Sequence, residues 1–355
     1  MRIIAARFVQ AIAPALVAGV IAMGVGSAAQ AQDIVMATFG GGVETTWEGA
    51  FATPFAKSTG HSVKIVAVPT PEAQVRGQAG NPQYNVAVVT YPQGANLLKD
   101  GLIETLDMAD VPVVAETNPA YLMKAPNNKL AGVSPYFMYY GIAINTDQAK
   151  KSDFTSWSDL ANPKWKDKLA LTRPIYLATY DLTIMAISAG GNENKIEPGV
   201  ELLRRTAKNA LTLYSSMAHM NSLLTRGEVA VGPYYSGRVW QLRREGAKNV
   251  DMVIPKEGAL MIPYIVVVPK GAKNFNIVKK WLNYIAMAEP QLRAMALGGY
   301  FPLNAKAKLP AEVEKEMGTS LEALMPRLHQ PDWAVISAAE KDRINMIEKM
   351  LASTK

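Results

Sequence analysis

The sequence predicts an α/β protein built from two lobes with a ligand cleft between them. Short apolar runs alternate with helical patterns along the chain, and this series occurs twice, over residues 33–137 and from residue 141 onward. Such alternation is typical of largely parallel sheets covered by helices, so each lobe is expected to have its own sheet. Because no flexible linker separates the two series, we expect strands to run directly between the lobes as hinges.

Both lobes are expected to be built from two separate stretches of chain. Lobe 1 should hold residues 33–137 and 266–302, and lobe 2 should hold residues 141–261 and 306–355. The predicted hinges lie near residues 138–140, 262–265 and 303–305.

The N-terminal segment has the pattern of a secretory signal peptide. Arg2 and Arg7 precede an apolar stretch over residues 8–25, and Ala29-Gln30-Ala31 forms a small-x-small cleavage site. An uncleaved membrane anchor is the alternative, which the proline and the cleavage site disfavour. We expect cleavage after Ala31, which leaves a mature chain of about 324 residues (355 minus 31) in the periplasm.

Composition narrows the function classes. Hydrophobic residues make up 49% of the chain and can fill two cores, yet no later apolar run reaches the roughly 18 residues of a spanning helix. Cysteine is absent, so no disulfide contributes. The formal charge of +7 comes from dispersed basic residues, a pattern of solvated surfaces that speaks against nucleic-acid binding.

The first series opens with a strand at residues 34–39 and a helix at 44–58. Trp47, Phe51 and Phe55 recur four apart and so form one apolar stripe on this helix. Pro54 should weaken the helix locally, and Gly60 should end it. Strands at 62–68 and 86–89 follow, then a helix that ends near residue 101.

The second series is longer and ends in a helical tail. β-Branched and apolar runs predict strands at 141–145, 169–172, 229–232, 250–254 and 262–268. Helical patterns cover residues 176–189, 198–208, 216–226 and 237–246, and most of the chain from residue 274.

Catalytic chemistry has little support in the residues. The only histidines are His61, His219 and His329, far apart and without metal-ligand spacing. No nucleophile elbow, zinc-protease motif or phosphate loop is present. We therefore expect no catalytic residue, no cofactor and no metal site.

Two turns between a strand and a helix are candidate ligand sites. Gly40-Gly41-Gly42 follows the first strand, and its backbone amides could face a ligand; a tight turn that needs glycine is the alternative. In Tyr234–Arg238, Ser236 could cap the next helix and Arg238 could bind an anion there. The alternative is an arginine that faces solvent or pairs with a carboxylate.

Open α/β sheets bind ligands at the carboxyl ends of their strands, which selects the site residues. The predicted ligand-binding residues are Gly41, Tyr91, Tyr139, Ser215, Tyr235, Arg238 and Tyr264. Candidates of second rank are Gly42, Thr90, Arg173 and Ser236.

The stretch from residue 224 to residue 274 resembles the solute-binding proteins of polyamine-type ABC importers. It contains Gly227-Glu228-Val229 before a strand, the aromatic turn at Tyr235-Ser236-Gly237, and the two motifs PKEGA (255–259) and PKGAKN (269–274). Weaker similarity in the same order extends over nearly all of the mature chain. The resemblance implies a two-lobe periplasmic binding protein fold of type II that closes on a small ligand. It also implies a membrane permease and an ATPase as partners, and we expect a monomer.

The resemblance leaves the charge of the solute open. Tyr235 stands where the family has an aromatic wall, but the acids expected for a polycation appear here as Tyr264 and as Arg173-Pro174. Unpaired buried charge is costly, so an anionic or zwitterionic solute, as in opine or phosphonate import, fits better. The alternatives are a true polyamine binder, a ferric-ion receptor that uses Tyr234 and Tyr235, and an exported hydrolase.

Overall fold

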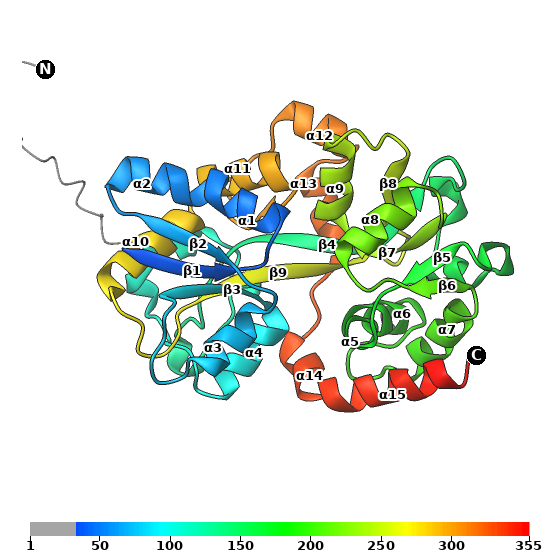
Figure 1. Ribbon diagram of the computed structural model, residues 1–355, viewed down its shortest axis with the longest axis horizontal. Coiled ribbons are helices and arrows are strands. Elements are labelled where there is room, and N and C mark those ends of the chain that lie inside the picture. Colours follow the sequence, from blue (N-terminus) through cyan, green and yellow to red (C-terminus); the bar gives the residue numbers. More distant parts are fainter. Residues whose placement is uncertain (1–32, 355) are drawn as a thin grey trace, which may run out of the picture. The chain divides into compact units, whose positions relative to one another are not determined.

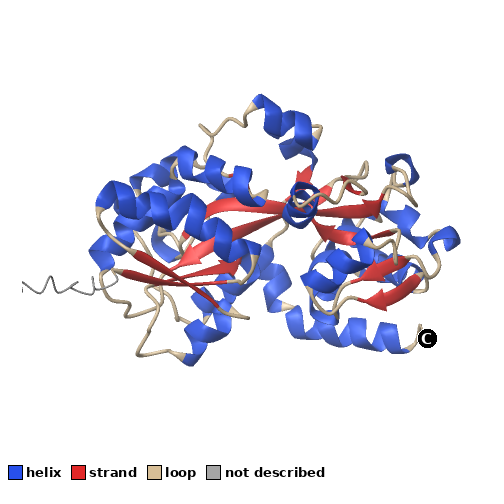
Figure 2. Ribbon diagram, turned by 45° about the horizontal axis from the view of Figure 1, so that its top comes forward, coloured by secondary structure: helices blue, strands red, loops and turns tan. Residues whose placement is uncertain are grey.

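The computed structural model describes residues 33–354, so the predicted signal peptide lies outside the described residues. Residues 33–354 form one compact unit of mixed α/β structure. Helices cover both faces of the sheet (Figure 2). Among residues 33–354, no helix is both long and apolar enough to cross a membrane.

The predicted strands and helices occur in the predicted order, and the structure adds a helix at residues 71–77 and a strand at residues 210–213 that were not predicted. The strands are β1 (Ile34–Thr38), β2 (Val63–Ala67), β3 (Val86–Thr90), β4 (Val133–Asn145), β5 (Leu169–Leu171), β6 (Ala210–Leu213), β7 (Val231–Tyr235), β8 (Val250–Val253), β9 (Ala259–Val267), β10 (Phe301–Pro302) and β11 (Leu328–His329). The helices up to β9 are α1 (Gly42–Thr46), α2 (Thr53–Thr59), α3 (Pro71–Gly77), α4 (Tyr91–Lys99), α5 (Pro174–Tyr176), α6 (Leu182–Ser188), α7 (Glu197–Ala207), α8 (Met217–Thr225) and α9 (Ser236–Arg244). Those after β9 are α10 (Phe275–Ala286), α11 (Ala288–Gly298), α12 (Ala311–Met317), α13 (Leu321–Leu324), α14 (Trp333–Ala338) and α15 (Glu340–Ala352).

All the strands named above belong to one hydrogen-bonded sheet, which corrects the expectation of two separate sheets. Its main path is β2-β1-β3-β9-β4-β7-β5-β6, and β8 and β10 pair with β4 and β11 with β9 beside this path. The pairs within each end of the path are parallel, as predicted, whereas β4 and β9 are antiparallel to their neighbours in the path. The two ends are continuous because β4 and β9 pair with each other and each reaches one end, β9 through β3 and β4 through β7.

We call the part around β1, β2 and β3 lobe 1, and the part around β5, β6 and β7 lobe 2. Both long strands, β4 and β9, pass between them (Figure 1). They contain two of the predicted hinge segments, residues 138–140 and 262–265. The exact lobe boundaries and the bending at these segments stay predictions.

The lobe 1 core confirms the predicted aromatic stripe. Trp47, Phe51 and Phe55 are all buried, and Trp281 of α10 contacts each of them. A π-helical segment, Trp47–Ala52, joins α1 to α2 without a break. The Ala50 carbonyl, four residues before Pro54, accepts from Nε of Arg293 at 3.0 Å, which offsets the missing N–H of Pro54. Gly60 ends α2 with a φ of 74°.

Candidate functional site

A cavity of about 330 Å³ lies between the lobes, at the carboxyl ends of strands from both. This is the position at which open α/β sheets bind ligands. The residues that line it are Phe39, Gly40, Val43, Val68, Pro69, Thr90, Gln93, Met138, Arg173, Tyr176, Tyr180, Ser215, Ser216, Met217, Tyr235, Arg238 and Tyr264.

The lobe 1 wall carries no charge. Phe39 and Gly40 follow β1, Val68 and Pro69 follow β2, and Thr90 ends β3. The backbone N–H of Thr90 donates to Oε1 of Gln93 at 3.0 Å, which fixes this amide at the start of α4. This wall can therefore offer apolar contact and a few neutral hydrogen bonds.

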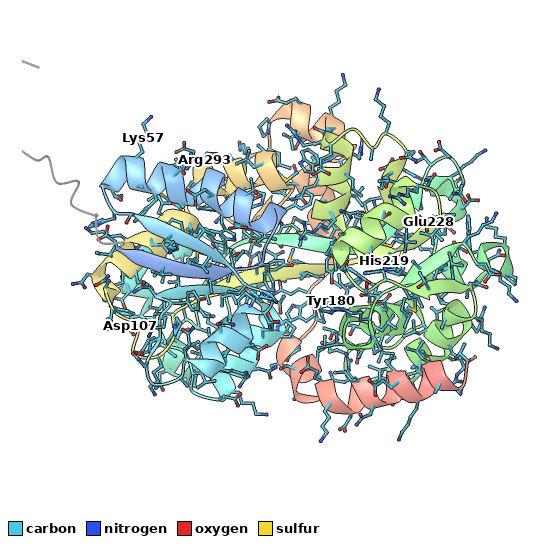
Figure 3. The ribbon with its side chains drawn as sticks, in the orientation of Figure 1. Lys57, Asp107, Tyr180, His219, Glu228 and Arg293 are labelled. Atoms are coloured by element: carbon cyan, nitrogen blue, oxygen red, sulfur yellow. The ribbon has the colours of Figure 1, made fainter. Side chains whose placement is uncertain are left out.

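The lobe 2 wall begins with a stack of flat groups. The Arg173 guanidinium lies 5.0 Å from the ring centre of Tyr176, and the rings of Tyr176 and Tyr180 lie 5.9 Å apart at an angle of 5°. Tyr180 belongs to a π-helical segment, Leu177–Asp181, and lies where the two lobes meet (Figure 3). Inserted π turns of this kind are frequent at functional sites because they redirect side chains.

Tyr235 and Tyr264 complete the aromatic wall from the ends of β7 and from β9. Burial raises the pKa of both phenols well above the usual range, so both are protonated at neutral pH. The hydroxyl of Tyr234 is engaged elsewhere, because it bonds to the carbonyl of Met217 at 3.0 Å and to Asn221 at 2.7 Å. Tyr235 lines the cavity and Tyr234 does not, so the two phenols do not face one common site. Within residues 33–354, no group of three His, Cys, Asp or Glu side chains could hold a metal ion. This arrangement does not favour the ferric-ion alternative.

Arg238 is the third residue of α9, close to the positive end of the helix dipole. It is half-buried, and its Nη1 donates to Oε1 of Gln241 at 3.0 Å. Gly42 leaves the room that Gln241 needs, since a Cβ there would lie 2.4 Å from the Gln241 amide. No carboxylate lines the cavity. An anion bound here would relieve the repulsion between Arg238 and the start of α9.

Helix α8 starts at the cavity with an ordered polar turn. Ser216 caps the helix, and its Oγ accepts from the backbone N–H of His219 at 3.1 Å. The backbone N–H of Ser215 donates in turn to Nδ1 of His219 at 3.2 Å. The Ser215 and Ser216 side chains are exposed at the cavity and could donate to a ligand oxygen.

A buried acid lies behind the tyrosine wall. Oδ2 of Asp181 accepts from the Tyr140 hydroxyl at 2.9 Å, whereas Oδ1 has no partner among the described residues. Burial raises the pKa of Asp181 to about 7, although the Tyr140 hydrogen bond opposes the shift. Tyr140 in turn contacts Tyr180 and Tyr235.

Six of the eleven predicted site residues line this cavity: Ser215, Tyr235, Arg238, Tyr264, Thr90 and Arg173. That they contact a ligand stays a prediction. The other five are Gly41, Gly42, Tyr91, Tyr139 and Ser236, and none of them lines it.

Tyr139 and Ser236 face the opposite side of the sheet. Side chains alternate along β4, so Met138 points into the cavity and Tyr139 points away, against Phe301. Ser236 is the first residue of α9 and does not cap it, and its Oγ accepts from the Tyr139 backbone N–H at 3.1 Å. The capping role predicted for Ser236 is therefore wrong.

Tyr91 and Gly41 lie outside the cavity for different reasons. The Tyr91 hydroxyl turns back into lobe 1, where it bonds to the Tyr121 carbonyl and to Ser134. Gly41 has a φ of 71° and supports the tight-turn alternative, while its neighbour Gly40 reaches the cavity.

Sequence reasoning missed several wall residues, above all Tyr176, Tyr180 and Gln93. Tyr176 and Tyr180 are four apart within one helical pattern, which in sequence is indistinguishable from a packing stripe. Gln93 could have been found, because Thr90 with Gln93 three residues later has the spacing of a capping box at the end of a predicted strand.

Comparisons with known proteins identify the family of this chain. Residues 50–319 match the model of a family described as bacterial extracellular solute-binding protein. The chain belongs to this family.

Two curated relatives cover most of the chain. Spermidine/putrescine-binding periplasmic protein 1 of Haemophilus influenzae is 28% identical over 273 residues, which are 74% of this chain and 74% of that protein. A Salmonella typhimurium periplasmic protein, whose name refers to 2-aminoethylphosphonate binding, is 22% identical over 320 residues, 87% of this chain and 89% of that protein.

Solved structures share the fold. MotA of A. tumefaciens B6, in complex with glucopine, has a TM-score of 0.73 at 20% identity and covers 90% of this chain and 99% of its own. A two-lobed periplasmic binding protein fold is therefore the architecture of this chain.

Proposed function

We propose that this protein is an exported receptor that binds a small organic solute with an anionic group and delivers it to an ABC importer. The observation that carries the proposal is the charge of the cavity, which has two arginines and no carboxylate among its lining residues. The names of the relatives refer to polyamines, to an aminophosphonate and to an opine, so the family accommodates both cations and anions.

The geometry supports an anion because both arginines have a free face. The described contacts of Arg173 are with an aromatic ring, and Arg238 donates to a neutral amide, so neither is neutralised by an acid that lines the cavity. A carboxylate, phosphonate or sulfonate would satisfy them through charge-assisted hydrogen bonds. The hydroxyls of Ser215 and Ser216 are placed to donate as well.

The same walls disfavour a polyamine. A dication would meet two like charges and no counter-charge, and burying it without one is expensive. A tyrosine wall can attract a single ammonium group, so a zwitterion with its anionic end at the arginines remains within the proposal.

The remaining features of the receptor are inferences from the family and the signal peptide pattern. The chain acts in the periplasm after cleavage behind Ala31, binds without catalysis or cofactor, and works as a monomer. Its partners are the solute, a permease and an ATPase. The lobes, with the boundaries given above, close over the solute by bending near residues 138–140, 262–265 and 303–305.

A ligand screen tests the proposal directly. Thermal unfolding of the purified chain is followed with putrescine, spermidine, amino acids, opines, dicarboxylic acids and phosphonates, because a ligand that binds only the folded state raises the midpoint. We expect members with an anionic group to stabilise the protein and the two polyamines to have little effect. Tight binding of spermidine by calorimetry, unchanged in Arg238→Ala, would overturn the anionic assignment.

A further inference from the structure

After the last predicted hinge (residues 303–305), the C-terminal segment packs first against lobe 1 and then against lobe 2. α14 lies beneath α4 of lobe 1, and α15 continues beneath the helices of lobe 2 (Figure 1). The chain therefore touches both lobes within residues 328–352, on the side of the cavity opposite to α1 and α9.

α14 is attached to lobe 1 by hydrogen bonds. The Ser337 hydroxyl bonds to the Asn96 side chain and donates to the Pro92 carbonyl at 3.4 Å, both in α4. Just before α14, Nε2 of Gln330 donates to the Ala120 carbonyl at 3.0 Å.

α15 is attached to lobe 2 by a buried arginine. Arg343 is 2% exposed, and its Nη1 donates to the Ala178 carbonyl at 3.1 Å and to the Thr183 hydroxyl at 3.0 Å. Its Nη2 donates to the Glu193 carbonyl at 3.0 Å. Burial lowers the pKa of Arg343 to about 10, so the guanidinium remains charged at neutral pH.

Trp333, the first residue of α14, connects this segment to the cavity wall. Its indole is 4% exposed and meets the Tyr180 ring edge-on, with centroids 6.1 Å apart at an angle of 81°. The Tyr180 ring stacks on the Tyr176 ring, and the Arg173 guanidinium packs on the other ring of this pair, Tyr176. Trp333 therefore lies at one end of a continuous series of side-chain contacts, and the cavity lies at the other. The indole Nε1 has no partner among the described residues, so the contact depends on the ring alone.

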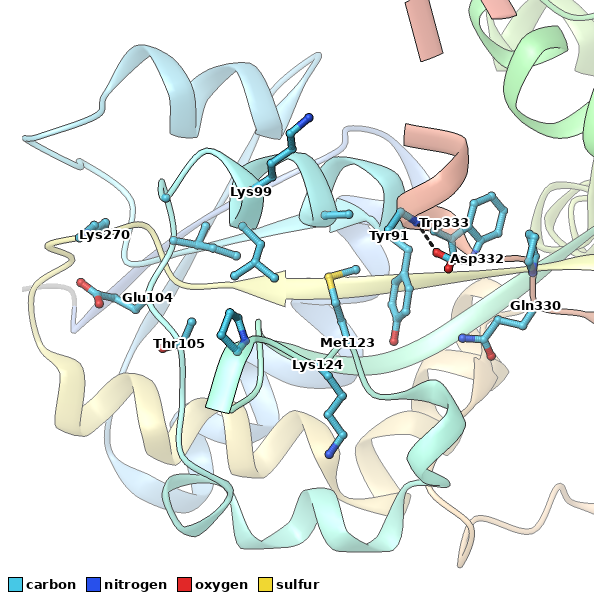
Figure 4. A pocket seen from close by; sticks show the side chains of 17 residues that line it. Tyr91, Lys99, Glu104, Thr105, Met123, Lys124, Lys270, Gln330, Asp332 and Trp333 are labelled. Carbon is cyan, nitrogen blue, oxygen red and sulfur yellow. Dashed lines mark hydrogen bonds between the residues drawn. The ribbon is translucent and has the colours of Figure 1, made fainter. Parts of the chain in front are cut away.

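Free space adjoins this segment on its lobe 1 side. A second cavity of about 770 Å³ is lined by α4, by Met123 and by residues 330–334 (Figure 4). Lys99 and Lys124 direct their amino groups away from Met123 and Tyr91 (Figure 4). Glu104, Lys270 and Asp332 also line this space. Residues 330–334 are held along their length, since the Asp332 backbone N–H donates to Oε1 of Glu193 at 2.9 Å and Trp333 is buried.

We propose that α14 and Trp333 form an additional connection between the lobes, besides the three hinge segments, which limits the separation of the lobes and holds Tyr180 in position on the cavity wall. Trp333 is a positioning residue, because it lies outside the cavity and acts through Tyr180. The proposal rests on the proposed receptor function for its purpose, but its test needs no ligand.

The absence of cysteine allows a direct test. Lys57→Cys in lobe 1 and Glu228→Cys in lobe 2 introduce two exposed thiols at opposite ends of the molecule (Figure 3). Spin labels on both report the distance between the lobes by pulsed electron resonance in the unliganded chain. We expect Trp333→Ala to broaden the distribution and move its mean to longer distances by more than about 2 Å. Trp333→Phe should restore the narrow distribution, because it keeps a ring against Tyr180.

A second variant covers the case in which Trp333→Ala does not fold. Ser337→Ala combined with Asn96→Ala removes the hydrogen bonds of Ser337 to α4, weakens the attachment of α14 to lobe 1 and leaves Trp333 in place. It should lengthen the distance in the same direction. Unchanged distributions in the folded variants would overturn the proposal. If these distances respond while the ligand screen finds no solute, the proposed function fails and the additional connection stands.

Discussion

The two walls of the cavity differ in what they can recognise. The lobe 1 wall consists of strand ends with apolar side chains, a hydroxyl and one amide, whereas the lobe 2 wall contributes both arginines, Tyr176, Tyr180 and Tyr235. Charged recognition is therefore concentrated on lobe 2, and lobe 1 supplies a neutral cover. We expect a solute to bind lobe 2 first through its anionic group and lobe 1 to close over the uncharged remainder.

The largest expected effect concerns the acid buried behind the lobe 2 wall. Asp181 has an ordinary pKa of 3.8 in the unfolded chain and of about 7 in the folded one. Between these values the folded state binds more protons, so the free energy of unfolding should fall as the pH rises from about 4 to about 7, by a few kcal/mol. Asp181→Asn should flatten this dependence and stabilise the protein at pH 8. Chemical denaturation over the pH range checks it, and equal slopes in both proteins would contradict it.

Removal of Arg238 should weaken binding of the anionic solute found by the screen. A charge-assisted contact is worth about 1.5–3 kcal/mol, so Arg238→Ala should lower the affinity by roughly tenfold to a hundredfold with little loss of stability. Arg238→Lys should recover part of this, because it keeps the charge and loses the planar fork. Calorimetry measures both. Arg204→Ala is the matched control, since Arg204 pairs with Glu201 on the surface of α7 and should leave the affinity unchanged.

Arg173→Ala should have a smaller effect, because Arg173 is exposed and solvent screens its charge. We expect a loss of about threefold to tenfold at low salt that shrinks at high salt. Titrations at two ionic strengths separate the outcomes. A loss that is independent of salt would mean that Arg173 acts through its contact with Tyr176.

The smallest effect is expected on lobe 1. Gln93 is bonded to the backbone of Thr90, so Gln93→Ala should cost about 1 kcal/mol of stability and change the affinity less than about threefold. Thermal unfolding measures the change in stability of this variant, and calorimetry measures its affinity for the solute. Together they test whether lobe 1 contributes little to recognition. A loss of affinity as large as that of Arg238→Ala would abolish the distinction between the walls.

The sequence predicted the order of elements and the strands that join the lobes, because apolar periodicity and turn residues are local signals. The sequence could not predict the register of β4. Met138 and Tyr139 are both suited to a cavity wall, and only the pairing of β4 with β9 decides which of the two side chains faces the cavity. The column of Tyr176 and Tyr180 depends on a π-helical turn that no residue pattern marks. Arg238 was within reach, since an arginine at the start of a helix is unfavourable without a partner.

The pairing of β9 also sets an order of folding. Lobe 1 has its first three strands by residue 90, but its sheet is completed only when residues 264–267 pair with β3 and when α10 covers Trp47. These contacts join residues more than 170 positions apart, and such distant contacts form slowly. Lobe 1, although first in the chain, therefore cannot become stable until β9 and α10 are present. A chain that ends before residue 259 should remain incompletely folded however well its earlier segments form helices and strands.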